Sequence, residues 1–120
     1  MDKGTHETVQ NAVVRADSAN RIAQSCAEAA EAVVYAGDYA GSAWGDVERQ
    51  RAMRQQAKKI LDALAALAKS AAEAATEAAA DVPESLENTR HIVTVDETAA
   101  KRNAADCAAR AKCFAAAWEL

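Results

Sequence analysis

Apolar residues recur at alternating spacings of three and four over most of the chain, which is the pattern of a helix with one buried face. The first such stripe predicts a helix over Thr5–Ala36, where neither proline nor glycine interrupts the pattern. Its expected core positions are Val9, Ala12, Ala16, Ala19, Ala23, Cys26, Ala30 and Val33.

A second helix is expected to begin near Asp46, whose side chain suits an N-cap, and to continue to about Val82. Between the two helices, three glycines at positions 37, 41 and 45 predict a turn, because glycine adopts backbone conformations that other residues avoid. The stripe of the second helix keeps its spacing for about four heptads, as in long antiparallel helices. It consists of Met53, Ala57, Ile60, Leu64, Leu67, Ala71, Ala75, Ala78 and Val82.

The only proline marks a break after the second helix. Asp81 and Glu84 are spaced as in a capping box, and Pro83 between them suits the first turn of a helix, where its missing N–H costs nothing. These residues predict a short helix over Pro83–His91. The four β-branched residues that follow predict an extended link over Ile92–Val95.

The last part of the chain predicts a third long helix that is capped by Thr94 or Asp96 and ends near Trp118. Its stripe is Ala100, Ala104, Cys107, Ala111, Phe114 and Trp118. The whole pattern predicts an all-α fold with one domain over residues 1–120. It is an up-down bundle of three long helices plus one short helix, and it resembles a four-helix bundle. Whether the last helix packs beside the first or swaps into a neighbouring molecule stays open at this stage.

Composition narrows the alternatives to this fold. Of 120 residues, 34 are alanine, four are glycine and one is proline. Collagen needs periodic glycine, and a β-sandwich needs many β-branched and aromatic residues, whereas only 4% of this chain is aromatic. Alanine on facing stripes lets helix axes approach to about 8 Å, but it buries little apolar area. We therefore expect additional burial from self-association into a homo-oligomer or from a partner.

Charge and hydropathy point to a protein of the cytoplasm. The net charge of -4 disfavours general nucleic-acid binding. The chain has no run of 18 apolar residues that would cross a membrane, and its first residues lack the apolar stretch of a signal peptide. Five cations and no acid occur from Arg49 to Lys59, whereas five acids and no cation occur from Glu28 to Glu48. Such blocks are expected to form complementary helix faces within a bundle.

Three cysteines, Cys26, Cys107 and Cys113, are expected to stay reduced. The first two fall on core stripes as small buried apolar side chains, whereas Cys113 falls beside its stripe as an exposed thiol. Together with His91 they are the only ligand set for an alternative that we keep open, a small-ligand or metal-binding bundle. Their spacing matches no zinc motif, so we expect neither a metal nor another cofactor.

No motif in the sequence indicates an enzyme. Acid pairs such as Glu28 and Glu31 lie at helical spacing, as they do on solvated helix faces. A catalytic pair would need at least one carboxyl group in an apolar pocket. The glycines of the turn are not followed by Lys and Ser or Thr, so they do not form a phosphate-binding loop.

Aromatic residues at the turn are the best candidates for a contact surface. Tyr35, Tyr39 and Trp44 cluster there in a chain with only five aromatic residues, and Tyr and Trp are frequent at binding hot spots. The alternative is that they fill the end of the bundle, where alanine leaves space. Three cations next to the turn share one face of the second helix by their spacing, and complete the set of candidate partner-binding residues: Arg51, Arg54 and Lys58.

The segment Tyr35–Trp44, with the sequence YAGDYAGSAW, leads into Glu48–Arg51 and then into the pair Ile60 and Leu61. In this order of motifs the chain resembles alanine-rich helical bacterial proteins that are often labelled immunity proteins. The segment Ala104–Arg110 also resembles a motif near the start of such proteins. The resemblance implies a small cytoplasmic protein that binds a protein partner and carries no catalytic residues. The sequence therefore predicts a non-enzymatic protein-interaction module, with an inhibitor or immunity-type protein as its most concrete form.

Overall fold

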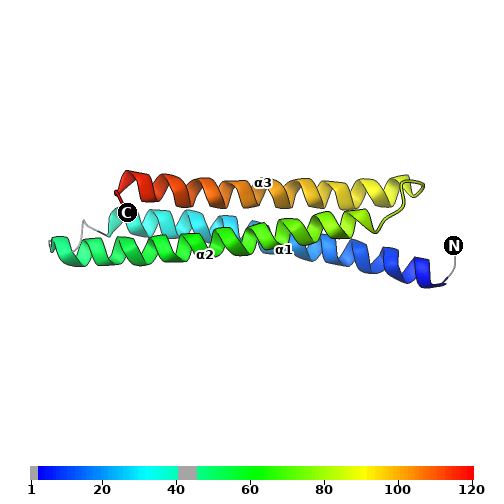
Figure 1. Ribbon diagram of the computed structural model, residues 1–120, viewed down its shortest axis with the longest axis horizontal. Coiled ribbons are helices and arrows are strands. Elements are labelled where there is room, and N and C mark those ends of the chain that lie inside the picture. The colour runs from blue at the N-terminus through cyan, green and yellow to red at the C-terminus, as the bar shows by residue number, and fades with distance from the viewer. Residues whose placement is uncertain (1–2, 41–45) are drawn as a thin grey trace.

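The protein folds into three long α-helices that lie side by side along one axis (Figure 1). The computed structural model describes residues 3–40 and 46–120, with the side chains of residues 5–40 and 46–120. The helices are α1 (Lys3–Tyr39), α2 (Val47–Ala80) and α3 (Glu87–Ala117), and each packs against both of the others. The bundle measures 66 × 18 × 17 Å, and the described residues contain no strand. The all-α fold is confirmed, and the last helix packs beside the first and the second alike.

The helix α1 buries the stripe that its sequence predicts. Seven of the eight expected core positions are buried, and Val33 is half-buried. The helix continues to Tyr39, three residues past the predicted end at Ala36, although Gly37 lies in this stretch. One glycine inside a helix costs only about 1 kcal/mol relative to alanine. Gly37 is buried, and the ring of Phe114 from α3 packs directly against it.

The helix α2 begins and ends at aspartates. Asp46 is its N-cap, as predicted, and its Oδ1 accepts hydrogen bonds from the backbone N–H of Glu48 at 3.0 Å and of Arg49 at 3.5 Å. Asp81, which the sequence predicts as the cap of a new helix, is instead the C-cap of α2, where its own N–H donates to the last carbonyls of that helix. Its carboxylate pairs with Arg15 of α1, so this interaction ties the end of α2 to α1.

The core stripe of α2 is only partly as predicted. Its C-terminal half and one position near its start are buried, namely Ala57, Ala71, Ala75, Ala78 and Val82. Met53, Ile60 and Leu67 were expected in the core but are 41%, 45% and 51% exposed. Leu61 and Ala68, one position further along, are buried instead, because α2 must face α1 and α3 at once.

Two predictions are wrong, namely the short helix over Pro83–His91 and the extended link over Ile92–Val95. The helix α3 begins at Glu87 and continues through both segments without a break. Each β-branched residue lowers helix propensity by only about 0.5 kcal/mol. Val93 is fully buried, in one cluster with Val82 and with alanines of α1 and α2, and this packing outweighs the local preference.

The C-terminal part of α3 packs as its stripe predicts. Its buried positions are Ala100, Cys107, Ala111 and Phe114, while Ala104 and Trp118 are half-buried. Because α3 has already begun at Glu87, neither Thr94 nor Asp96 caps it. Asp96 Oδ1 instead accepts a hydrogen bond from Asn20 Nδ2 of α1 at 3.2 Å, which links the two helices near the middle of the bundle.

Candidate interaction surfaces

The two tyrosines of the predicted contact surface form an exposed pair on α1. Tyr35 and Tyr39 stand one turn apart, with ring centroids separated by 4.6 Å and ring planes at 32°. They are 66% and 59% exposed, so they do not fill the end of the bundle. Trp44, the third aromatic residue of that prediction, lies outside the described residues.

Arg54, another predicted contact residue, is held between α1 and the end of α3. Its guanidinium carbon lies 3.4 Å from the centroid of the Trp118 ring, and its Nε donates a hydrogen bond to the carbonyl oxygen of Gly37 at 3.3 Å. The indole Nε1 of Trp118 donates in turn to Asp38 Oδ1 at 2.9 Å. Arg54 is half-buried, and these contacts make it a connection between all three helices.

The remaining predicted cations lie on the surface of α2. Lys58 Nζ pairs with Asp62 Oδ2 one turn further along, at 2.8 Å, and Arg51 is exposed. A surface ion pair of this spacing contributes only about 0.3–0.5 kcal/mol. The contact of Arg54 with Trp118 shows that the side of α2 shared by these three cations is turned toward α3.

The tyrosine pair and Arg54 differ in their surroundings, because the tyrosines are exposed and Arg54 is half-buried. Successive residues of a helix are rotated by about 100°, so Tyr35 and Tyr39 are each turned by about that angle around α1 from Ala36 and Ala40. These two alanines line a groove between α1 and α2. Arg54 lies between the helices, against Trp118 at the end of α3 and within hydrogen-bond distance of the Gly37 carbonyl of α1. The tyrosine pair is therefore exposed on α1, whereas Arg54 is engaged in contacts between the helices.

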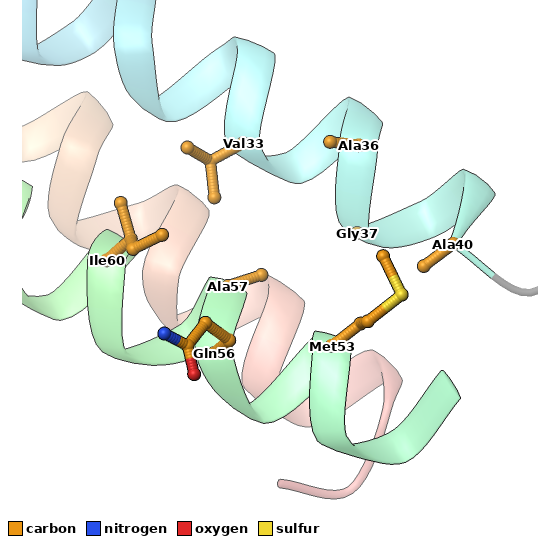
Figure 2. Close-up of a pocket in the computed structure, with 8 residues that line it drawn as sticks. All are labelled: Val33, Ala36, Gly37, Ala40, Met53, Gln56, Ala57 and Ile60. Carbon is orange, nitrogen blue, oxygen red and sulfur yellow. The ribbon is translucent and has the colours of Figure 1, made fainter. Parts of the chain in front are cut away.

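An open apolar groove runs between α1 and α2 (Figure 2). Figure 2 shows Met53 of α2 reaching toward Ala40 of α1, and the side chain of Val33 pointing from α1 toward α2. This stretch of the groove encloses about 230 Å³, and its other lining residues are Ala36, Gly37, Gln56, Ala57 and Ile60. A further stretch of about 400 Å³ lies nearer the middle of the bundle, lined by Arg21, Ile22, Ser25, Cys26, Ala29, Leu64 and Leu67.

The groove is bordered by a longer surface of uncharged residues, which we call the seam face. Its residues follow alternating spacings of three and four on both helices, and all are exposed or half-buried. They are Ile22, Ser25, Ala29, Ala32 and Ala36 of α1, with Met53, Gln56, Ile60, Ala63, Leu67, Ser70 and Ala74 of α2. This spacing is the one by which helices pack in coiled coils, so the seam face has the pattern of a second packing surface on the outside of the bundle.

The sequence contains the signal for the seam face as a second stripe on α2. Met53, Ile60 and Leu67 repeat every seven residues, and Leu61 and Ala68 repeat the same spacing one position later. Treated as one stripe, these positions predict a single buried face. In the structure they form two faces, of which the second packs against α1 and α3 and the first remains exposed.

The cysteines lie where their stripes predict. Cys26 and Cys107 are buried in one core cluster, Cys113 is exposed, and all three are free thiols. Burial raises the pKa of the Cys26 thiol above its ordinary value. The pKa of Cys107 is raised mainly by burial and further by its neighbours Cys26 and Asp106, while Arg110 acts in the opposite direction. Protonated, buried thiols are poor nucleophiles and poor metal ligands.

The four ligands of the metal-binding alternative are spread through the bundle. His91 and Cys113 lie near opposite ends of α3, about 33 Å apart along the helix axis. Cys26 and Cys107 lie in one core cluster, and Cys107 is about 9 Å along α3 from the exposed Cys113. Within residues 3–40 and 46–120, no group of three or more His, Cys, Asp or Glu side chains could hold a metal ion.

Comparison of the chain with protein-family models, with curated proteins and with solved structures finds no match in any of the three. In the part of the chain that the structure describes, no helix is both long enough and apolar enough to cross a membrane.

Proposed function

We propose that this protein is a non-enzymatic protein-interaction module that binds a protein partner through the seam face. The observation that carries the proposal is the exposure of Met53, Ile60 and Leu67, three large apolar side chains within a stripe that is free of charge. Single apolar residues are normal on a protein surface, whereas a contiguous apolar surface marks an interaction site.

A helical protein surface suits the seam face better than a small ligand does. Small-molecule sites are concave pockets that bury most of the ligand and orient it through a few placed polar groups. The groove between α1 and α2 is instead open along its length, and its side chains repeat at helical spacing. A partner helix lying in this groove would insert its own side chains at spacings of three, four and seven residues.

The tyrosine pair extends the proposed contact surface at one end. Tyr35 and Tyr39 are exposed at the end of α1, and tyrosine contributes large contact area with few rotatable bonds. Arg54 is engaged within the bundle, so its role in this proposal is to support the end of the groove. Arg51 and Lys58 lie on the side of α2 away from the seam face, and a role for them in binding stays a separate prediction.

An inhibitor or immunity-type protein is the form of this function that the sequence resemblance over Tyr35–Trp44 favours. Such a protein acts by covering a surface of its partner, which requires a rigid docking face and no catalytic group. The three free cysteines suit the reducing conditions of the cytoplasm, where we propose that the protein acts.

Site-specific crosslinking in cells that produce the protein tests this proposal. A photoreactive residue at Ile60 should form covalent adducts with a polypeptide, and mass spectrometry of the crosslinked peptide should locate the bond at the seam face. The matched control carries the same residue at Ile92 of α3, which is 51% exposed and lies outside the seam face. A yield of polypeptide adducts at position 60 no higher than at position 92 would contradict the proposal.

A further inference from the structure

We infer that the partner of the seam face is a second copy of this chain, with α1 of each copy packed on α2 of the other. This inference rests on the proposed function, since it names the partner of the same surface. A two-fold axis parallel to the helices produces this arrangement, in which identical faces meet. Four helices, two from each copy, would then surround a new core.

The sizes of the side chains on the two halves of the seam face are complementary. The half on α2 carries three large apolar residues, Met53, Ile60 and Leu67. The half on α1 consists mostly of small residues, with Ala29 and Ala36 at the spacing of seven. When α1 packs on α2 of the second copy, the large residues of each chain enter spaces beside the small residues of the other. Such knobs in holes are how helices pack most closely.

The outer edges of the seam face are formed by the residues that directly precede its seven-residue repeats in sequence. These repeats are Ile22, Ala29 and Ala36 on α1 and Met53, Ile60, Leu67 and Ala74 on α2. Four of the edge residues are charged. The edge of α1 carries a cation, an acid and a tyrosine, and the edge of α2 carries a cation and an acid separated by alanines. These edge residues are Arg21, Glu28 and Tyr35 of α1, with Ala52, Lys59, Ala66 and Glu73 of α2.

The relative register of α1 and α2 determines which edge residues lie at the same height. The carbonyl oxygen of Gly37 accepts a hydrogen bond from Arg54, and Gly37 lies against Ala57. Gly37 of α1 is therefore at the same height along the bundle axis as residues 54–57 of the antiparallel helix α2. Counting from there at equal rise per residue, Arg21 is level with about residues 70–73, and Lys59 is level with about residues 32–35. A two-fold axis parallel to the helices preserves these heights between the two copies.

The edge charges then match across the interface. Arg21 meets Glu73 of the second copy, and Lys59 meets the ring of Tyr35 of the second copy, where a cation–π contact forms. Arg21 also pairs with Asp17 of its own helix, but its side chain is 78% exposed there and remains accessible. Each contact occurs twice in the dimer, so four attractive edge contacts flank the apolar seam.

The other two-fold arrangement is less favourable. An axis across the helices would stack α1 on α1 of the second copy in antiparallel orientation. Glu28 lies near the middle of the seam face on α1, so this axis would bring Glu28 against its own copy. Two carboxylates facing each other repel, whereas the axis parallel to the helices sets Glu28 level with about residues 63–66 of α2, which include no acid. Attractive edge contacts would arise about either axis, since the axis across the helices would set Arg21 against Tyr35 and Lys59 near Glu73. The repulsion of the two Glu28 carboxylates is what separates the two arrangements. The charge order therefore favours the axis parallel to the helices.

The seam face is large enough for a dimer. On α2 it extends from Met53 to Ala74, which corresponds to a length of about 32 Å, and two adjacent helices give a width of about 20 Å. On α1 the face is shorter, about 21 Å from Ile22 to Ala36, so the projected area is about 500 Å² per copy. The corrugated surface raises the accessible area toward the roughly 800 Å² per partner of a standard interface. The core within one copy contains few large side chains, since the largest that are fully buried are Leu61, Val82, Val93 and Cys107.

Sedimentation of the full chain over about 1–200 μM tests the inference, because dimers of standard interfaces have dissociation constants within or below this range. We expect a mass of twice the 12.6 kDa of the chain at the upper concentrations. Changing Ile60→Glu together with Leu67→Glu should raise the dissociation constant at least about 100-fold and leave helical circular dichroism unchanged. The matched control, Ile92→Glu with Val95→Glu, alters residues of α3 that are 51% and 52% exposed and should remain dimeric.

A charge exchange keeps the inference falsifiable if the double glutamate variant fails to fold. Glu73→Arg should raise the dissociation constant about 10-fold, and adding Arg21→Glu should restore it to within about 3-fold of the original. A monomer throughout the concentration range, a dimer that the Ile60 and Leu67 changes leave intact, or a lack of restoration would each overturn the inference. A monomer whose position 60 crosslinks to a different polypeptide would overturn the second copy as partner while leaving the proposed function standing.

Discussion

The guanidinium carbon of Arg54 lies 3.4 Å from the centroid of the Trp118 ring, so the start of α2 is held by the residue that ends α3. The same arginine donates to the carbonyl of Gly37 in α1, and Trp118 donates to Asp38 in α1. Three helices are thereby joined at the end of the bundle where the tyrosine pair lies. In a core built mostly of alanine, these polar and aromatic contacts replace packing that larger side chains would supply.

Changing Arg54→Ala should lower the free energy of unfolding by about 1–2 kcal/mol, because it removes the contact with the Trp118 ring and a hydrogen bond from a charged donor. The matched control Arg51→Ala changes an exposed cation of the same face and should stay within about 0.5 kcal/mol of the original. Urea unfolding followed by circular dichroism measures both. Equal effects of the two changes would show that Arg54 does not hold the bundle end together.

Gly37→Ala should destabilise the fold by about 1–3 kcal/mol, although alanine is the better helix former. A Cβ at this position would lie 2.5 Å from Cζ of the buried Phe114 ring, so the ring must move. The double variant Gly37→Ala with Phe114→Leu should lose less than the two single changes predict together, because the smaller side chain makes room. Thermal unfolding of the four proteins measures this coupling, and strict additivity would count against the close contact.

The three thiols should differ in reactivity toward a thiol-specific reagent near pH 8. Burial raises the pKa of Cys26 and of Cys107, so both are protonated and covered, whereas Cys113 is exposed. One thiol per chain should react rapidly in the native protein and three in denaturant. Rapid reaction of two or more thiols in native protein would contradict the buried placement, and Cys113→Ser should abolish the rapid phase.

The same two thiols predict a direction for the pH dependence of stability. Their pKa values in the folded protein lie above the ordinary value of 9.0, so folding favours the protonated form. Their contribution to stability is complete below pH 9 and declines as the pH rises above it, because the unfolded chain then releases these protons more readily. Replacing Cys26 and Cys107 by alanine should flatten the alkaline part of a stability profile, and an unchanged slope would contradict this prediction.

Val93→Ala should lower the free energy of unfolding by about 2 kcal/mol, since it removes two buried methyl groups and leaves a cavity. Its neighbour Ile92 is 51% exposed on the same helix, and Ile92→Ala should change stability by less than about 0.5 kcal/mol. An extended link would also place these adjacent side chains on opposite faces, so hydrogen exchange is the measurement that distinguishes the link from a helix. Hydrogen exchange should show slowly exchanging amides across residues 92–95. Fast exchange there would contradict the continuous helix and support an extended link instead.

The helices themselves, the Asp46 cap and the stripes of α1 and α3 could be predicted because they depend on residues close in sequence. Asp46 reaches the N–H groups of its own first turn, and the alanines of α1 repeat at one consistent spacing. The continuity of α3 could not be predicted, because β-branched residues weaken a helix only slightly and Val93 gains its burial from alanines more than ten residues away in sequence. The prediction from local preference is wrong there because the contacts that stabilise the helix come from residues distant in sequence.

The candidate surface divides in the same way. Spacing alone placed Tyr35 beside Tyr39 and put Arg51, Arg54 and Lys58 on one face, since each relation holds within a single helix. Which side of each helix meets solvent was decided by three helices packing together. That packing buried Leu61 rather than Ile60, and it drew Arg54 inward to Trp118. A helix with two apolar stripes can bury either one, and only the positions of its neighbours choose between them.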